Sequence, residues 1–253
     1  MLRNRVIPVL LVDQRRLVKS VQFRNPRYLG DPVNAVRIFN EKEVDEIVIL
    51  DIGATRAGRR ADFEFIADLA SEAFMPMAYG GGLSSHDDVE RVFGLGIEKI
   101  VMNTAAVEHR DALSRAASAY GNQAVVGAID VGRRWTGKME AYVRSGTRAT
   151  GKKPEDLACD LESAGAGELL VNSIPNDGMM AGYDLELIRS VAKSVSVPVI
   201  ACGGAGSLDD LRKAVVDGGA SAAAAGSLFV YQGRHKAVLI NFPSQETRDR
   251  LFA

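Results

Sequence analysis

The stretch YGGGLSSHDDV at residues 79–89 decides the fold, together with the similar stretch CGGAGSLDDL at residues 202–211. In each, a short apolar segment ends at a glycine loop, and serine and aspartate then begin an amphipathic segment. Glycine permits a tight turn, and serine and aspartate cap helix N-termini. Both stretches therefore predict a strand, a loop and a helix in succession.

The same unit recurs along the chain. Apolar runs without polar alternation are typical of strands covered on both faces, as in a parallel sheet. Amphipathic segments separate them; the first, residues 31–45, begins with Asp31 as a predicted N-cap and Pro32 at the first helical position. The predicted strands are residues 6–12, 46–52, 75–80, 99–103, 124–130, 168–173, 197–204 and 221–227, and further predicted helices are 84–96, 184–195 and 207–219.

Eight such units in 253 residues predict a (β/α)₈ TIM barrel of the α/β class, as a single domain over residues 1–253. A doubly wound open sheet is the alternative, because periodicity does not reveal whether a sheet closes. The chain also resembles itself, since Gly82 and Gly204 lie 122 residues apart in matching loops. This repetition predicts two half-barrel repeats, at about residues 1–122 and 123–253.

Composition excludes several classes of protein. Lys plus Arg number 31 and Asp plus Glu 32, so a general basic face for nucleic acid is not expected, and the composition leaves only a local basic patch open. Two cysteines, Cys159 and Cys202, are too few for a disulfide framework or a Cys₄ zinc site, and we predict no metal and no cofactor. No apolar run approaches the roughly 20 residues that a membrane span needs. We expect a cytoplasmic protein with no membrane partner.

The repeated loops predict two sites for anions. Glycine lets the backbone approach a bound oxyanion, and helix N-terminal N–H groups attract it. Hydroxyl and amide groups at the ends of the following strands add donors, which suits a phosphorylated small molecule with two anionic ends. The alternative is that the glycines only shape tight turns. The predicted sites are Gly82 with Asn103 and Thr104, and Gly204 with Gly226 and Ser227.

Loop motifs in a fixed order connect the chain to a known family. They are RVIPVL (5–10), VQFRN (21–25), GDPVNAVRIFNEKEVDEIVILDI (30–52), YGGG (79–82), VMNTAAV (101–107), AVVGAID (124–130), TGK (150–152), NDGMMAGYDLELI (176–188), VIACGGAGS (199–207) and AAGSLF (224–229). Over nearly its whole length the chain resembles the cyclase subunit of imidazole glycerol phosphate synthase.

This resemblance implies a division of labour between two chains. A separate glutaminase sits on the N-terminal face of the barrel, and ammonia passes through the barrel to the C-terminal face. There it cleaves and cyclises an aminoimidazole-carboxamide nucleotide that bears two phosphates. The glutaminase partner must be another chain, because no GxCxG nucleophile motif occurs in this sequence.

The resemblance also implies an acid–base pair of two aspartates, one at the end of the first strand and one at the end of the fifth. Asp130 matches the second, but Leu11 stands where the first is expected. Leucine cannot transfer a proton, so the mechanism loses one partner. Asp13 lies two residues further, about 6–7 Å along a strand, which is too far to replace it without a shift.

Of the other ligand-binding positions implied by the family, some keep the family's residue and some do not. Lys19 is retained and can hold an anion, and Asp177 and Gly178 are retained in the loop after the sixth strand. Pro175 replaces an aspartate in that loop, and Val9 replaces a cysteine. These departures, like Leu11, lie on the catalytic side.

Four charged residues match the family's ammonia gate at the opposite end of the barrel. Two positive and two negative side chains at strand starts can form a ring of paired charges. The alternative is that they are ordinary solvated strand ends. The matching residues are Arg5, Glu46, Lys99 and Glu168.

A retained gate with a lost catalytic aspartate indicates changed chemistry. The segments 24–46 and 235–246 are similar to a paralogue group that serves sugar amidation in bacterial surface-polysaccharide synthesis. In that group the barrel and its glutaminase supply ammonia to a third protein, which makes an acetamidino group. Two alternatives stay open: a working cyclase of histidine biosynthesis, and a non-catalytic partner that activates a glutaminase.

Overall fold

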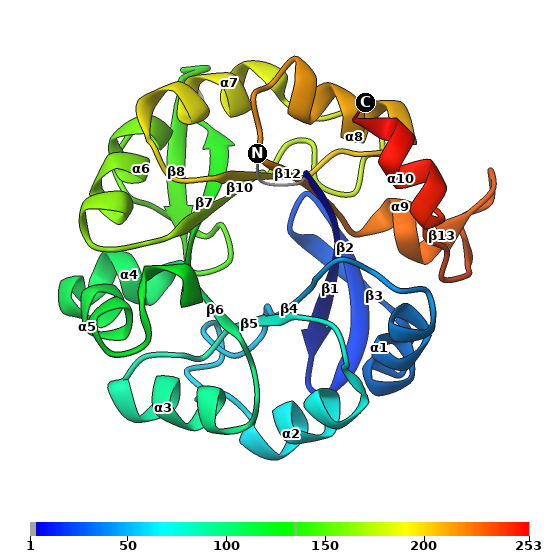
Figure 1. Cartoon of the computed structure of the whole chain (residues 1–253). Helices are drawn as coiled ribbons and strands as arrows, with labels where there is room; N and C mark the ends of the chain where they lie inside the picture. Colours follow the sequence, from blue (N-terminus) through cyan, green and yellow to red (C-terminus); the bar gives the residue numbers. More distant parts are fainter. Residues whose placement is uncertain (1–3, 135, 253) are drawn as a thin grey trace.

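The computed structural model describes residues 4–134 and 136–252. Within these ranges eight parallel strands form a closed ring, because each strand pairs with the next and β12 pairs back with β1. The predicted barrel is confirmed, and the open sheet is excluded by this closure. Figure 1 shows the strands at the centre and the helices around them. The barrel strands are β1 (Arg5–Asp13), β4 (Ile47–Asp51), β5 (Met77–Gly80), β6 (Lys99–Met102), β7 (Val125–Arg133), β10 (Glu168–Ser173), β11 (Val199–Cys202) and β12 (Ala222–Ala225).

The helices between the strands begin where the sequence predicts caps. Ser85 and Ser207 each form a reciprocal capping box, with Asp88 and Asp210 respectively. No helix in the described ranges is long and apolar enough to cross a membrane. The helices are α1 (Pro32–Glu41), α2 (Phe63–Glu72), α3 (His86–Gly94), α4 (Thr104–Glu108), α5 (Arg110–Tyr120), α6 (Pro154–Ser163), α7 (Leu185–Ser194), α8 (Leu208–Val216), α9 (Ser227–Val230) and α10 (Gln245–Leu251), with a 3₁₀ turn at Asn122–Ala124.

The first predicted helix, residues 31–45, is too long. Helix α1 ends at Glu41, and Glu43 has φ of +52°, which no helix can accommodate. The residues that follow turn the chain toward the start of β4. This early end matters for the lower rim of the barrel, because it leaves Glu46 buried at the entrance to β4.

Two hairpins at the mouth of the barrel were not predicted from the sequence. One follows β1 and consists of β2 (Arg16–Val21) and β3 (Arg24–Gly30); the other follows β7 and consists of β8 (Met139–Val143) and β9 (Arg148–Ala149). They occupy equivalent places in the two proposed half-barrels, whose division stays a prediction. A small separate sheet, β13 (Tyr231–Gln232) with β14 (Ala237–Val238), follows α9.

Alternate residues of each strand enter two separate apolar clusters. On β1, Val6 and Leu10 pack with the helices, whereas Ile7 and Val9 join a second cluster drawn from the barrel strands alone. That second cluster fills the barrel interior, as expected from the period of two along a strand. Its members are Ile7, Val9, Val48, Ala78, Val101, Val126, Ala128, Leu170, Ile200, Cys202, Ala222 and Ala224, with Leu11 and Leu50 packed against it.

Candidate functional site

A cavity lies at the C-terminal ends of the barrel strands. It is the place where loops from every strand converge in this fold. All the residues predicted for catalysis or ligand binding line it, although they come from segments spread over more than 200 residues. They are Leu11, Lys19, Gly82, Asn103, Thr104, Asp130, Asp177, Gly178, Gly204, Gly226 and Ser227.

Asp130 is the candidate acid–base group of this cavity. It lies on β7, paired in register with Asn172 of β10. Asp130 is half-buried in the cavity wall, and desolvation by the surrounding protein, with a smaller effect of the negative charge of Asp177, raises its pKa to about 7. A carboxyl group with this pKa can give or accept a proton near neutral pH.

Leu11 lines the same cavity from β1 and carries no proton. Asp13, two residues further, turns away from the cavity: its carboxylate lies 3.8 Å from the guanidinium of Arg59, and it is not part of the lining. The Asp13 carboxylate lies against Gly53, where an added Cβ would come within 1.9 Å of an Asp13 oxygen. Asp13 therefore does not supply the carboxylate that the sequence analysis expected at position 11.

Lys19 reaches the cavity from hairpin strand β2. Its ammonium group donates to the Asp177 carboxylate at 2.9 Å and to the Ser20 carbonyl at 2.7 Å, and the residue is only 5% exposed. Gly178 permits this arrangement, because its φ is +73° and an added Cβ would lie 2.6 Å from the Ser20 carbonyl oxygen. Lys19 is thus held as a paired, immobilised cation at the wall of the cavity.

The first predicted anion site has side chains already engaged with protein. The Asn103 amide donates to the carbonyls of Ala128 at 3.0 Å and Tyr142 at 3.2 Å. The Thr104 hydroxyl accepts from the backbone N–H of Arg144 at 2.9 Å. Both residues therefore hold hairpin β8–β9 over the cavity, and side-chain donors for a ligand are scarce on this side.

The second predicted anion site differs. The Ser227 hydroxyl is buried and has no hydrogen-bond partner among the described residues, although it lines the cavity. Its neighbour Gly226 lies close to Lys19, whose Cε would be 3.3 Å from an added Cβ. Gly204 has φ of +124°, and an added Cβ would lie 2.1 Å from the carbonyl oxygen of Gly182, so glycine is required there by packing. A buried hydroxyl without a partner is a group that a ligand can satisfy.

Sequence analysis missed several polar residues of the cavity lining, among them Asp51, Arg56 and Asn172. Asp51 ends β4 and accepts from the N–H groups of Gly53 and Ala54, while burial raises its pKa. Asn172 is buried on β10, and the oxygen of its side-chain amide has no hydrogen-bond partner among the described residues. Asp51 and Asn172 lie at the ends of predicted strands, which is the signal that could have revealed them.

The two cysteines have different surroundings. Cys202 is buried beside the cavity, where burial raises the pKa of its thiol to about 12, and Cys159 is exposed on α6. A thiol with this pKa stays protonated at neutral pH and is a poor nucleophile. In the described part of the chain, no group of three or more His, Cys, Asp or Glu side chains is placed to hold a metal ion.

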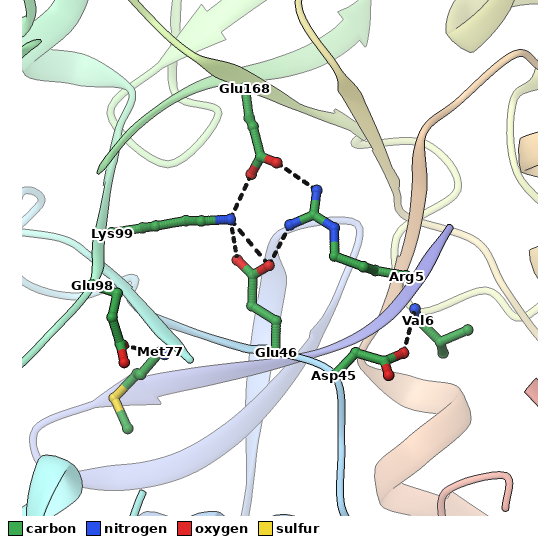
Figure 2. A network of polar contacts seen from close by, with 8 residues as sticks. All are labelled: Arg5, Val6, Asp45, Glu46, Met77, Glu98, Lys99 and Glu168. Carbon is green, nitrogen blue, oxygen red and sulfur yellow. Dashed lines mark hydrogen bonds and ion pairs between the residues drawn. The ribbon is translucent and has the colours of Figure 1, made fainter. Parts of the chain in front are cut away.

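At the opposite end of the barrel, four charged side chains close a ring (Figure 2). Lys99 lies 3.1 Å from Glu46 and 2.9 Å from Glu168, and Arg5 bonds to both carboxylates from the other side. The Glu46 side chain is only 3% exposed, so these residues are not ordinary solvated strand ends. Outside the ring, Asp45 accepts from the backbone N–H of Val6 in β1, and Glu98 accepts from the backbone N–H of Met77 in β5.

Comparison with known proteins agrees with this geometry. The chain matches the family described as histidine biosynthesis protein over residues 5–236. The chain belongs to this family. Its relatives of the HisF type align with nearly all of it. One from Pseudomonas aeruginosa, provisionally named imidazole glycerol phosphate synthase subunit hisF2, is 48% identical and covers 98% of the chain and 99% of its own length.

Two further HisF-type relatives extend the comparison. One from Leptospira interrogans, provisionally named imidazole glycerol phosphate synthase subunit HisF, is 47% identical over the full length of both chains. One from Vibrio vulnificus, provisionally named subunit hisF3 of that synthase, is 43% identical over 99% of the chain and 96% of its own length. The predicted resemblance to the HisF type is therefore confirmed.

Proposed function

We propose that this HisF-type barrel is a subunit of a glutamine amidotransferase complex. A separate glutaminase binds the N-terminal face, ammonia travels through the barrel, and a phosphorylated small molecule binds at the C-terminal face. The proposed role is ammonia supply for acetamidino-sugar synthesis in surface-polysaccharide assembly, with a third protein as the amidating partner. The synthase subunit names of the Pseudomonas and Vibrio relatives support the partnership with a glutaminase.

The observation that carries this role is Leu11 in the wall of the cavity that contains Asp130. General acid–base catalysis typically contributes 10²–10⁴-fold to a rate, and a two-carboxylate mechanism needs both groups. Because Asp13 is turned toward Arg59, no carboxylate of β1 replaces the missing one. A barrel with one of the two groups is better suited to delivering ammonia than to cyclisation.

The interior of the barrel supports a route for ammonia. Arg5, Ile7, Val9 and Leu11 follow one another at every second position of β1, from the charged ring at one end to the cavity at the other. The residues between the two ends are apolar on the other strands as well. An apolar interior favours neutral ammonia over ammonium, because burying an unpaired charge is costly. Ammonia would thus cross from ring to cavity without losing its nucleophilic form.

The ligand proposal rests on the residues that line the cavity at the C-terminal ends of the barrel strands. Lys19 and the free hydroxyl of Ser227 lie on the side of Gly226 and Gly204, and the loop with Gly82 lies on the side of β5. A molecule with two anionic ends fits such a pair of loops. This part of the proposal predicts phosphate or sulfate bound near Ser227 in crystals grown with either anion.

One observation favours the second candidate, a working cyclase of histidine biosynthesis. The pKa of Asp130 near 7 leaves one group that can transfer a proton at neutral pH. If Asp130 alone suffices, the barrel retains cyclase activity, and the loss of the aspartate at position 11 only slows it.

Three measurements separate these functions: growth of an auxotroph, stimulation of glutamine hydrolysis, and amidation by the complete complex. Expression in a histidine auxotroph that lacks its cyclase should not restore growth, although the same protein is folded in the cell; growth would show the cyclase function instead. The purified barrel should stimulate glutamine hydrolysis by its glutaminase several-fold. Stimulation without growth or amidation would indicate a non-catalytic activator, and no stimulation would contradict the amidotransferase proposal.

A further inference from the structure

The loop that follows β4 forms one wall of the cavity. Successive turns fix its backbone, with the N–H groups of Ala57, Gly58 and Arg59 donating to the carbonyls of residues 53, 55 and 54. The loop also packs on the glycine loop after β5, where Ala61 donates to the Gly82 carbonyl at 3.2 Å. The loop backbone from which Arg56 projects is thus fixed as a part of the wall.

Three arginines of this loop have different surroundings. Arg59 lies 3.8 Å from Asp13 and 3.9 Å from Asp51. Arg60 lies 2.6 Å from Asp88 and 2.7 Å from Asp87. Arg56, by contrast, lines the cavity and has no ion pair or hydrogen bond with any residue in the described ranges.

The other charges of the lining are already compensated or negative. Lys19 is paired with Asp177, and Asp51 accepts two backbone N–H groups near Arg59. Asp130 adds a second carboxyl group. Among the described residues of the lining, Arg56 is therefore the cation that no protein carboxylate neutralises. An anionic ligand needs such a group, because a lining of net negative charge would otherwise repel it.

We infer that Arg56 binds the second anionic group of the ligand, on the side of β4 and β5. Lys19 and Ser227 hold the first group on the side of β12. This inference rests on the proposed phosphorylated ligand and extends it, because the side chains of Asn103 and Thr104 are engaged with hairpin β8–β9. Guanidinium stays charged at every physiological pH and can bind two oxygens of a phosphate or carboxylate at once.

The test compares two probes on one set of variants. Inorganic phosphate reports on the site at Ser227, and fructose 1,6-bisphosphate reports on both sites together. Calorimetric titration should show that Arg56→Gln weakens bisphosphate binding at least about 10-fold, because the variant loses a charge-assisted hydrogen bond to the ligand. The same variant should change phosphate binding less than about 2-fold, and Arg56→Lys should recover bisphosphate affinity only in part, because lysine cannot bind bidentately.

Arg115→Gln is the matched control, because Arg115 is an exposed arginine of α5 outside this cavity and loses the same charge. Equal weakening by Arg115→Gln and Arg56→Gln would overturn the inference, since it would indicate only a change in net charge. Bisphosphate binding that is unchanged in Arg56→Gln would overturn the role of Arg56 but not the phosphorylated ligand of the proposed function. No binding of either probe to the unaltered protein would overturn both the inference and the phosphorylated ligand of the proposed function. Thermal unfolding of each variant checks the fold.

Discussion

Leu11 and Asp130 line one cavity from two different strands, β1 and β7. One side chain is apolar, and the other is a carboxyl group whose pKa burial raises to about 7. Leu11 also packs on the apolar interior that leads to the charged ring. The mouth thus combines a single acid–base group with an apolar exit from the barrel, which is the arrangement on which the proposed change of chemistry depends.

Introducing the missing carboxylate tests this relationship. The unaltered barrel, supplied with ammonium salt, should turn over the cyclase substrate at least about 10²-fold more slowly than a working cyclase. Leu11→Asp should recover part of the loss, measured as product formed at a fixed ammonium concentration. Leu50→Asp is the matched control, because Leu50 is the register partner of Leu11 on β4 and also lines the cavity. Rapid turnover by the unaltered protein, or equal gains from both variants, would contradict the prediction.

The raised pKa of Asp130 predicts how stability depends on pH. The folded protein holds this proton up to about pH 7, whereas the unfolded chain releases it near pH 4. Between these values the folded state binds more protons, so this group makes folding less favourable as pH rises. Asp130→Asn should therefore match the unaltered protein near pH 4 and be more stable at pH 8, by a few kcal/mol at most, since each unit of pKa difference is worth about 1.4 kcal/mol.

Urea unfolding of both proteins at several pH values measures this difference. Asp13→Asn serves as the control, because Asp13 lies beside Arg59 outside the cavity. A stability difference between Asp130→Asn and the unaltered protein that stays constant from pH 4 to pH 8 would show that Asp130 titrates normally.

Replacing Ser227 should change phosphate affinity without lowering the stability of the fold. Because it is buried without a partner among the described residues, Ser227→Ala removes no intramolecular hydrogen bond and should leave the free energy of unfolding unchanged or slightly raised. Phosphate binding should weaken several-fold. Ser207→Ala should do the reverse, with a loss of about 1 kcal/mol of stability because Ser207 caps α8, and little change in phosphate affinity. If Ser227→Ala binds phosphate normally, Ser227 is not a ligand.

The charged ring predicts how tightly glutamine hydrolysis is coupled to ammonia incorporation. Lys99→Ala leaves the carboxylates of Glu46 and Glu168 with Arg5 as their remaining partner in the ring. Because the side chains are largely buried, we expect a stability loss of about 1–2 kcal/mol, more than an exposed pair would give. The ratio of glutamate formed to ammonia incorporated should rise above one in the full complex, as ammonia escapes.

Glu98→Gln is the control for the ring, since Glu98 lies on the same rim and is bonded to the Met77 N–H outside the ring. This variant should keep the ratio near one. An unchanged ratio in Lys99→Ala would mean that the ring stabilises the barrel without gating ammonia.

The sequence by itself determined the order of the eight barrel strands and the residue types at their ends, but not the hairpins β2–β3 and β8–β9. Val-rich and Ile-rich runs predict strands that are covered on both faces, because their side chains are apolar on both sides of the strand. Ser85 and Ser207 begin helices because their hydroxyls accept hydrogen bonds from backbone N–H groups in the first turn. These are short-range effects, so the alternation of strand and helix was predictable without coordinates. The anion-site residues at the ends of predicted strands could be named for the same reason, whereas Lys19, Asp177 and Gly178 were identified only through the resemblance to the cyclase family.

Only the tertiary structure decided which of these groups are free to act. Closure of the barrel brings Glu168 to Lys99 and Asp177 to Lys19, contacts between residues far apart in the sequence. It also engages Thr104 with hairpin β8–β9 and leaves Arg56 and Ser227 without partners in the described ranges. Whether a donor is already used depends on neighbours that folding supplies, and no local pattern of residues encodes those neighbours.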